Sequence, residues 1–159
     1  MKFQLYQWGD FMSKLKNEIL RDVGMLARCV QTMSDIKYRK LKLQKGQFTF
    51  LTRICEHPGI NLICLSNILK VDKTTTTKAV QKLIKDEYVR REQAPDDKRS
   101  WKIFPANKAL AIYPCIIHEE NSYIETCLNG FNQEEKEMAC FLFRKMRENI
   151  EREWKHLRS

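Results

Sequence analysis

Apolar side chains recur at every third or fourth position over residues 11–35, which is the spacing of one helix face. The set consists of Phe11, Leu15, Ile19, Val23, Leu26, Val30 and Met33. Polar residues fill the other face, so a long amphipathic helix is predicted. Its apolar stripe needs a cover, which is either the rest of the chain or a second copy. The basic stretch 36–45 follows as a connection.

Three shorter helices are predicted next, at residues 46–57, 62–69 and 73–87. Pro58-Gly59 ends the first of them. Asn61 and Asp72 are suitable N-caps for the second and third, because their short side chains accept hydrogen bonds from free backbone N–H groups. A three-residue link joins the last two helices. Two short helices connected in this way form a helix-turn-helix.

The outward face of the third short helix carries hydroxyls and cations and no bulky apolar side chain. Its residues are Lys73, Thr74, Thr75, Thr77, Lys78 and Gln81. Four consecutive threonines need a reason, because a branched Cβ lowers helix propensity. Short hydroxyl side chains can enter a major groove and bond to phosphates or base edges. The threonines could instead serve only as caps, but their position after a helix-turn and between lysines favours DNA contact.

A β-hairpin is predicted after this helix, with strands at residues 88–93 and 100–104 and a turn at 94–98. Helix, turn, helix and hairpin is the order of elements in a winged helix-turn-helix. Arg99 lies near the tip of the hairpin beside Lys98, where an arginine can enter the narrow minor groove of DNA. A weak surface pair between Arg99 and Asp97 is the alternative.

Two long helices are predicted in the C-terminal third, at residues 105–128 and 132–154. Pro105 ends the second strand and suits the first turn of a helix, where no N–H is needed, and Gly130 is a typical stop signal. Pro114 lies inside the first of these helices and is expected to kink it. Asn132 and Glu135 have the spacing of a capping box at the start of the second.

The formal net charge of +9 is unevenly distributed. Counting Lys and Arg against Asp and Glu gives +6 for residues 1–47, +4 for residues 70–102 and −1 for residues 103–159. A basic excess of this kind favours an anionic partner, and nucleic acid is the leading candidate. The dense run from Lys37 to Lys45 could touch a DNA backbone or could serve only to keep the protein in solution.

Several other classes of protein do not fit this sequence. The six cysteines have no Cys-x-x-Cys spacing and pair with no histidine at ligand spacing, so no metal or other cofactor is expected. No stretch approaches the roughly 20 apolar residues of a spanning helix, and the N-terminus lacks a secretory h-region. We therefore expect a cytoplasmic protein with reduced thiols and no membrane contact. Catalytic motifs such as His-Glu-x-x-His are absent, so an enzyme is not expected.

Four motifs occur in a fixed order along the chain: Leu65-x-x-Ile68-Leu69, the segment 71–78, Asp97-x-Arg99-Ser100 and Gly130-Phe131-Asn132-x-x-Glu135. Their order and spacing, over residues 11–155, resemble those of the MarR family of bacterial transcriptional regulators. The motif around Arg99 is the most specific. The chain departs from the family pattern at Glu87, where glycine is usual, at Thr76, where an apolar residue is usual, and at Pro105-Ala106, where Leu-Thr is usual.

The resemblance implies a mainly α fold with a small β-hairpin wing, formed by a single chain over residues 1–159. Residues 36–104 would form the winged helix-turn-helix, and residues 11–35 and 105–156 a helical dimerisation layer. A homodimer would bind a pseudo-palindromic site in double-stranded DNA and repress transcription. In this scheme the contacts are Lys73, Thr74, Thr75, Thr77, Lys78 and Gln81 from the recognition helix, and Lys98 and Arg99 from the wing that Asp97 shapes.

Many members of the family are released from DNA by small, often aromatic effectors. The residues that would line such a pocket are Tyr38, Phe50, Tyr113 and His118, although core packing explains them equally well. Oxidant sensing through an N-terminal cysteine does not carry over, because the first cysteine is Cys29. A winged-helix adaptor that binds another protein is the alternative function. It would need apolar anchors on residues 73–82, where lysines and threonines are found.

Overall fold

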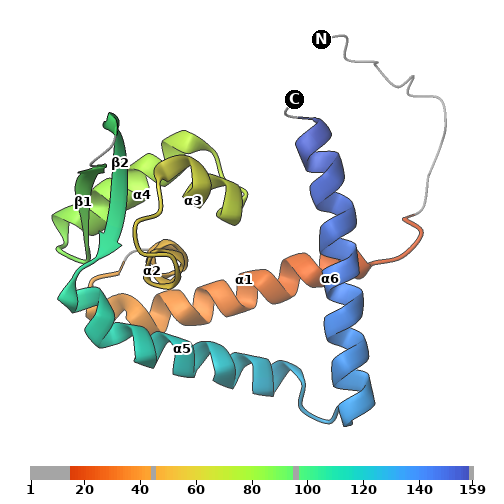
Figure 1. Ribbon diagram of the computed structural model, residues 1–159. Helices are drawn as coiled ribbons and strands as arrows, with labels where there is room; N and C mark the ends of the chain where they lie inside the picture. Colours follow the sequence, from red (N-terminus) through yellow and green to blue (C-terminus); the bar gives the residue numbers. More distant parts are fainter. Residues whose placement is uncertain (1–14, 44–45, 95–96, 158–159) are drawn as a thin grey trace, which may run out of the picture. The chain divides into compact units, whose positions relative to one another are not determined.

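The computed structural model describes residues 15–43, 46–94 and 97–157, without the side chains of residues 94 and 97–100. Within these ranges the chain is mainly helical and carries one β-hairpin (Figure 1). In chain order the elements are α1 (Ile19–Tyr38), the 3₁₀ turn η1 (Arg39–Leu41), α2 (Gln47–Glu56), α3 (Leu62–Leu69), α4 (Lys73–Lys85), β1 (Val89–Ala94), β2 (Asp97–Pro105), α5 (Asn107–Cys127) and α6 (Gln133–His156). Two compact units result, Met1–Ala109 and Leu110–Ser159.

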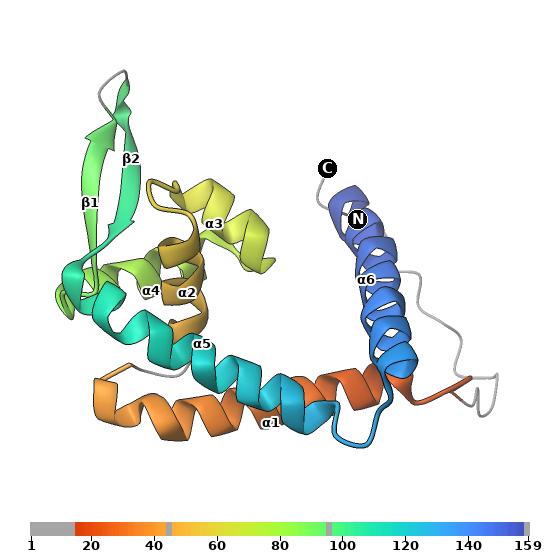
Figure 2. The ribbon, with the colours of Figure 1, turned by 60° about the horizontal axis from the view of Figure 1, so that its bottom comes forward.

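The first unit contains a helix-turn-helix and a hairpin built on a buried apolar core. Leu51 and Ile54 of α2, Leu65 of α3, Leu83 of α4 and Ile103 of β2 are almost fully buried. In the helices these positions recur at the spacing of one inner face. Because α4 contacts α2, α3 and β1, it is held from several sides. The hairpin projects beyond these helices (Figure 2).

The hairpin is antiparallel and places Arg91 opposite Ile103. The loop before α3 also pairs with β2: the Gly59 N–H donates to the Ile103 carbonyl (2.8 Å), and the Ile103 N–H donates to the Ile60 carbonyl (2.9 Å). The base of the hairpin is therefore fixed to the helix-turn-helix. Both strands reach further into residues 94–98 than predicted, because a shift in register lets the pairing continue.

The helix caps predicted in the first unit are confirmed. The Asn61 side chain accepts a hydrogen bond from the Cys64 N–H (2.8 Å). Asp72 accepts one in the same way from the Thr75 N–H (2.8 Å). As a result α3 spans the predicted residues and α4 starts where predicted. The helix α2 is one residue shorter at each end than predicted.

The first helix begins later than predicted within the described residues. Residues 11–14 lie outside the described part of the chain. Residues 15–18 precede the helix, which begins at Ile19. An apolar spacing therefore did not suffice for helix formation over residues 15–18, where no side-chain cap is formed at Glu18.

The C-terminal end of α1 and the η1 turn occupy a stretch that was predicted to be only a connection. The helix continues because its inner face remains engaged with α2. Tyr38 is buried and its ring packs against Phe48, with centroids 5.3 Å apart. The Asp35 carboxylate accepts a hydrogen bond from the Gly46 N–H (3.0 Å) at the start of α2.

The prediction that Pro105 ends the second strand is confirmed, and the prediction that it also opens the next helix is wrong. Pro105 is the last residue of β2, opposite Val89, and the following Ala106 N–H donates to the Tyr88 carbonyl (2.9 Å). A strand end accommodates proline because its missing N–H removes no essential ladder bond there. The extended chain continues one residue further, and α5 begins at Asn107.

Glu87 occupies the left-handed region, with a φ of 60°. The two backbone bonds of a Schellman motif surround it: the Tyr88 N–H donates to the Leu83 carbonyl (2.8 Å), and the Glu87 N–H to the Ile84 carbonyl (3.0 Å). Glycine is favoured at such a position because a Cβ is strained there. The chain therefore makes with glutamate a turn that favours glycine.

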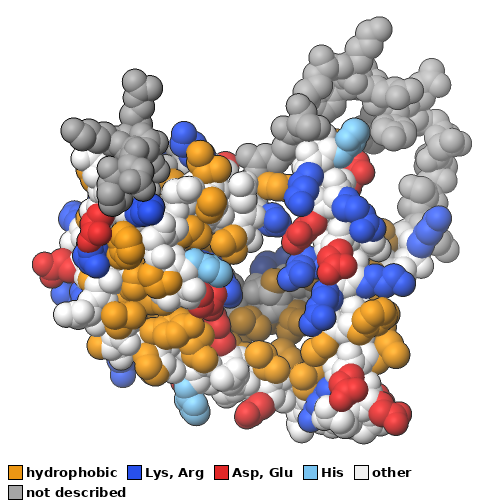
Figure 3. Space-filling model, viewed as in Figure 1, with side chains coloured by type: hydrophobic (Ala, Val, Ile, Leu, Met, Phe, Trp, Pro, Cys, Tyr) orange, Lys and Arg blue, Asp and Glu red, His pale blue; other side chains and the backbone are white. Residues whose placement is uncertain are grey.

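The second unit comprises most of α5 and all of α6. α5 passes through Pro114 without ending, and α6 begins with the predicted capping box: the Glu135 N–H donates to Asn132 Oδ1 (2.9 Å), and the Asn132 N–H to Glu135 Oε2 (2.8 Å). Acidic and basic side chains alternate along α6 (Figure 3). None of the helices in the described ranges combines the length and apolar content that crossing a membrane requires.

Candidate nucleic-acid interface

The side chains predicted to contact DNA from α4 lie on one face of that helix. Lys73, Thr74, Thr75, Lys78 and Gln81 are exposed, and Thr77 is half-buried. The opposite face, formed by Thr76, Val80 and Leu83, is buried in the first unit. The structure thus brings the predicted cations and hydroxyls together on a surface that is free to meet a partner.

Asp72 organises the beginning of this surface. Its carboxylate accepts hydrogen bonds from the Thr75 hydroxyl (2.5 Å) and the Thr75 N–H (2.8 Å). The bond from the Thr75 hydroxyl has the largest effect in lowering the pKa of Asp72, and the bond from the Thr75 N–H adds to it. The charged form of Asp72 is therefore stabilised. The Thr77 hydroxyl similarly donates to the Lys73 carbonyl (2.7 Å). Capping and DNA contact are therefore compatible roles for these threonines, since a hydroxyl oxygen that donates its proton can still accept.

Thr76 is a polar residue at a buried position of α4. Its side chain is fully buried, and its hydroxyl donates to the Asp72 carbonyl (3.0 Å). Ser66 Oγ in α3 donates to Thr76 Oγ1 (2.8 Å). A buried hydroxyl is tolerated when it is hydrogen-bonded. The pair also links the two helices of the helix-turn-helix at a defined position.

The inner face of the hairpin meets α4. Arg91, Trp101 and Ile103 line a small cavity of about 80 Å³, whose other walls are Leu62, Thr77, Val80, Gln81 and Ile84. The Arg91 guanidinium lies 4.5 Å from the centre of the Trp101 ring. Arg91 was not among the residues predicted from the sequence to contact DNA. The strand register would have been needed to find it.

The wing residues Asp97, Lys98 and Arg99 belong to β2, but their side chains lie outside the described part of the structure. Their predicted roles stay predictions.

The basic run from Lys37 to Lys45 includes the η1 turn. There the Leu41 carbonyl accepts a hydrogen bond from the hydroxyl of Tyr88 (2.5 Å), a residue just beyond the C-terminal end of α4. That end is about 20 Å of helix away from Lys73. The described part of the run is therefore anchored far from the N-terminal contacts of α4.

The four residues predicted to line an effector pocket belong to two units. Tyr38 and Phe50 are core residues of the first unit. Tyr113 is half-buried and His118 is exposed, and both lie on α5 within the second unit. Their joint role in binding an effector stays a prediction.

The thiols and other potential metal ligands form no recognisable site within the described ranges. No group of three His, Cys, Asp or Glu side chains is arranged to hold a metal ion there. All six cysteines are free, and five are exposed. Burial, followed by the charge of Glu56, raises the pKa of the sixth, Cys55, to about 11, which keeps it as an unreactive thiol near neutral pH.

Comparison with known proteins shows the family to which the chain belongs. Residues 43–101 match the model of the MarR family. The chain is 37% identical over 142 residues to the HTH-type transcriptional regulator YybA of Bacillus subtilis (strain 168), which covers 89% of this chain and 95% of YybA. The chain belongs to the MarR family. The MarR resemblance predicted from the sequence motifs is therefore confirmed.

Solved MarR structures share the fold over most of its length. A MarR protein from Peptoclostridium difficile is 55% identical with a TM-score of 0.88, covering 92% of this chain and 95% of that one. A MarR family regulator from Listeria monocytogenes, crystallised with a 26mer DNA, is 35% identical with a TM-score of 0.84 over the same shares. The predicted fold and function are thus confirmed: this MarR protein is a DNA-binding transcriptional regulator.

Proposed function

We propose that this MarR regulator represses transcription as a homodimer in which each subunit inserts α4 into a major groove of a pseudo-palindromic site. The composition of the exposed face of α4 is the observation that carries this proposal. It offers Lys73 and Lys78 for phosphates and Thr74, Thr75 and Gln81 for base edges. An adaptor surface would instead expose apolar anchors, and α4 exposes no large apolar side chain.

The fold supports insertion of α4 in two ways. The Ser66–Thr76 hydrogen bond fixes the angle between α3 and α4, and the bonded loop at Gly59 and Ile60 fixes the base of the wing. A preformed surface loses little conformational freedom on binding. Lys98 and Arg99 on the wing would then enter the flanking minor groove, where negative potential is enhanced.

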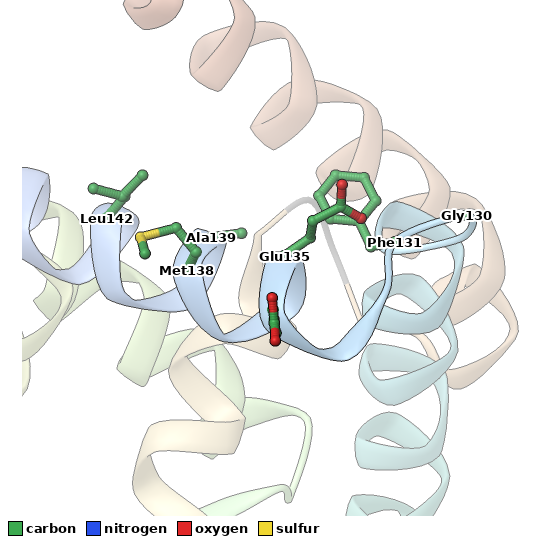
Figure 4. Close-up of a pocket in the computed structure, with 7 residues that line it drawn as sticks. Gly130, Phe131, Glu135, Met138, Ala139 and Leu142 are labelled. Atoms are coloured by element: carbon green, nitrogen blue, oxygen red, sulfur yellow. The ribbon is translucent and has the colours of Figure 1, made fainter.

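MarR regulators bind DNA as dimers, and the second unit offers a surface for a second copy. Phe131, Met138 and Leu142 line an open hollow along α6 (Figure 4). Phe141, Phe143 and Ile150 are also exposed large apolar residues of this helix. Burial of such residues between subunits supplies the main favourable free energy of dimer formation. Two recognition helices would then sit about 34–36 Å apart if their half-sites are one turn apart.

Repression would be relieved when a small aromatic effector favours a dimer whose two recognition helices no longer match the half-site spacing. An effector shifts this equilibrium only by its differential affinity for the two states. Tyr38, Phe50, Tyr113 and His118 are the residues predicted from the sequence to contact such a ligand. Serine substitution of Tyr113 should abolish release without changing DNA affinity.

The test is a titration of the full-length protein into a labelled duplex from the region upstream of its own gene, at several salt concentrations. We expect a dissociation constant of about 10⁻⁸ M or tighter at physiological salt, a steep loss of affinity with added salt, and much weaker binding to a scrambled duplex. Equal binding to both duplexes would contradict sequence-specific recognition. Absence of binding to either duplex at low salt would favour the adaptor function.

A further inference from the structure

We propose that Arg91 on β1 is a DNA phosphate contact and that Trp101 holds its guanidinium in position. The proposal rests on the proposed function, because it takes α4 as the helix that enters the groove. It adds a residue from the inner face of the wing that the sequence motifs of the recognition helix and the wing tip do not include.

The position of Arg91 comes from the strand register. Arg91 pairs with Ile103, and Gln93 pairs with Trp101, so Arg91 and Trp101 are diagonal neighbours on one face of the hairpin. Both line the cavity whose other wall includes Thr77 and Gln81 of α4. Arg91 is therefore next to the recognition surface of α4.

The charge of Arg91 is available to a partner. Arg91 is exposed, and within the described part of the chain no carboxylate pairs with it. Its neighbour Arg90 points to the other face of the hairpin, where it forms an ion pair with Glu92 and lies 5.0 Å from the centre of the Phe104 ring. The two consecutive arginines thus differ: the charge of Arg90 is neutralised within the protein, and that of Arg91 is not.

The stacked geometry suits phosphate recognition. The Arg91 guanidinium lies 4.5 Å from the centre of the ring of Trp101, a residue that is 41% exposed. A guanidinium uses its face to stack on an aromatic ring, and this leaves its N–H groups, which lie in the plane, free to donate to two phosphate oxygens. Stacking also restricts a long side chain before DNA arrives, so less conformational entropy is lost on binding.

A purely structural role of the pair makes a different prediction. If Arg91 and Trp101 only stabilised the hairpin, either substitution would lower the thermal stability and leave the number of ions released on DNA binding unchanged. If Arg91 neutralises a phosphate, its loss lowers the slope of log affinity against log salt by about 0.9. The salt slope therefore separates a phosphate contact from hairpin stabilisation.

The experiment measures duplex affinity at several salt concentrations for the full-length dimer and for Arg91→Gln, Arg90→Gln and Trp101→Leu. We expect Arg91→Gln to bind about tenfold more weakly at physiological salt, equally on the operator and on a scrambled duplex, with a salt slope reduced by about 1 per subunit engaged. Trp101→Leu should bind several-fold more weakly with an unchanged slope, because the charge remains but is less well positioned. The matched control Arg90→Gln should keep the wild-type slope.

An unchanged slope for Arg91→Gln would overturn the phosphate contact. Wild-type affinity for Trp101→Leu would overturn the positioning role of the ring. Thermal melting accompanies each variant, and where Arg91→Gln does not fold, Arg91→Met, which keeps the apolar stem against the indole, takes its place under the same criteria. Failure of the wild-type protein to bind any duplex would refute the proposed function, and that result is distinct from failure of the Arg91 variants.

Discussion

At the scale of single residues, this chain keeps the geometry of its family with unusual side chains. Glu87 adopts a φ of 60° where glycine would be relaxed, and Thr76 is buried with its hydroxyl bonded where an apolar residue would suffice. Both cases leave the backbone path intact and change only the local free energy. They are therefore suited to direct measurement by substitution.

Glu87→Gly should raise the free energy of unfolding by about 0.5–1 kcal/mol. Relief of the left-handed strain on a residue with a Cβ contributes about 1–2 kcal/mol, and the greater freedom of glycine in the unfolded chain offsets part of it. Urea unfolding at a fixed protein concentration measures the change. Lys85→Gly, two residues earlier in a right-handed helical position, is the control and should lower stability by about 1 kcal/mol. A destabilised Glu87→Gly would show that the turn is not strained.

Thr76→Val should lower the free energy of unfolding by about 1 kcal/mol, because it removes one partner of a buried hydrogen bond. Ser66 Oγ can still donate to the Leu62 carbonyl (2.8 Å) in this variant, so the double variant Ser66→Ala with Thr76→Val should be destabilised by less than the sum of the two single losses, because both single variants remove the same Ser66–Thr76 bond. The same urea titrations give the coupling free energy of the pair. Strictly additive losses in the double variant would mean that the two hydroxyls do not interact.

At the scale of elements, the Tyr88 side chain ties the end of α4 to η1 and to the start of α5. Its hydroxyl donates to the Leu41 carbonyl (2.5 Å), and Lys108 Nζ lies 4.3 Å from the centre of its ring while donating to the Asp86 carbonyl (2.7 Å). The ring is almost fully buried. One side chain thus joins three elements of the first unit.

Tyr88→Phe should lower the free energy of unfolding by about 1 kcal/mol at neutral pH through loss of this hydrogen bond. Burial and the charge of Asp86 raise the pKa of Tyr88, so the folded protein favours the neutral phenol. Its contribution is complete below the ordinary tyrosine pKa of about 10 and declines as the pH rises through the folded pKa. Wild type should therefore lose more stability than Tyr88→Phe in alkaline titrations followed by urea unfolding. Parallel alkaline profiles would contradict this assignment.

Elements whose limits are set by local chemistry could be predicted from the sequence. Asn61 and Asp72 cap α3 and α4 as expected, because capping depends on residues three positions apart. The end of α1 at Tyr38 and the start of α5 at Asn107 depend on contacts with α2 and with the chain beside β1, which a sequence pattern does not contain. The α4 face of the interface was predictable from its helical spacing. Arg91 was missed because only the register between β1 and β2 places it beside Trp101.

At the scale of the whole molecule, the cationic face of α4 and the exposed apolar residues of α6 belong to different units. The net charge of +4 over residues 70–102 falls on α4 and the hairpin, while α6 carries exposed large apolar residues among alternating charges. A regulator that binds two half-sites needs both properties, one for the DNA and one for the second copy. Weakening the dimer should therefore weaken DNA binding although no DNA contact is altered.

Leu142→Asp should shift the protein towards monomers and lower its operator affinity by at least tenfold, since a carboxylate without a partner is costly in an apolar interface. Light scattering measures the mass in solution, and duplex titration measures the affinity. Glu148→Gln, at an exposed polar position of the same helix, is the control and should change neither. A Leu142→Asp protein that stays dimeric would remove this part of α6 from the interface.

The hydroxyl bonds at the start of α4 have a consequence for the operator itself. Because Thr75 and Thr77 donate their only hydroxyl protons to Asp72 and to the Lys73 carbonyl, they face the DNA as acceptors. In the major groove the donors are the amino groups of adenine and cytosine, whereas guanine and thymine present acceptors at the same edges. The base nearest each of these two hydroxyl oxygens should therefore be adenine or cytosine, whose amino group can donate to it, and selection of binding sequences from a random library would reveal that bias at two positions of each half-site.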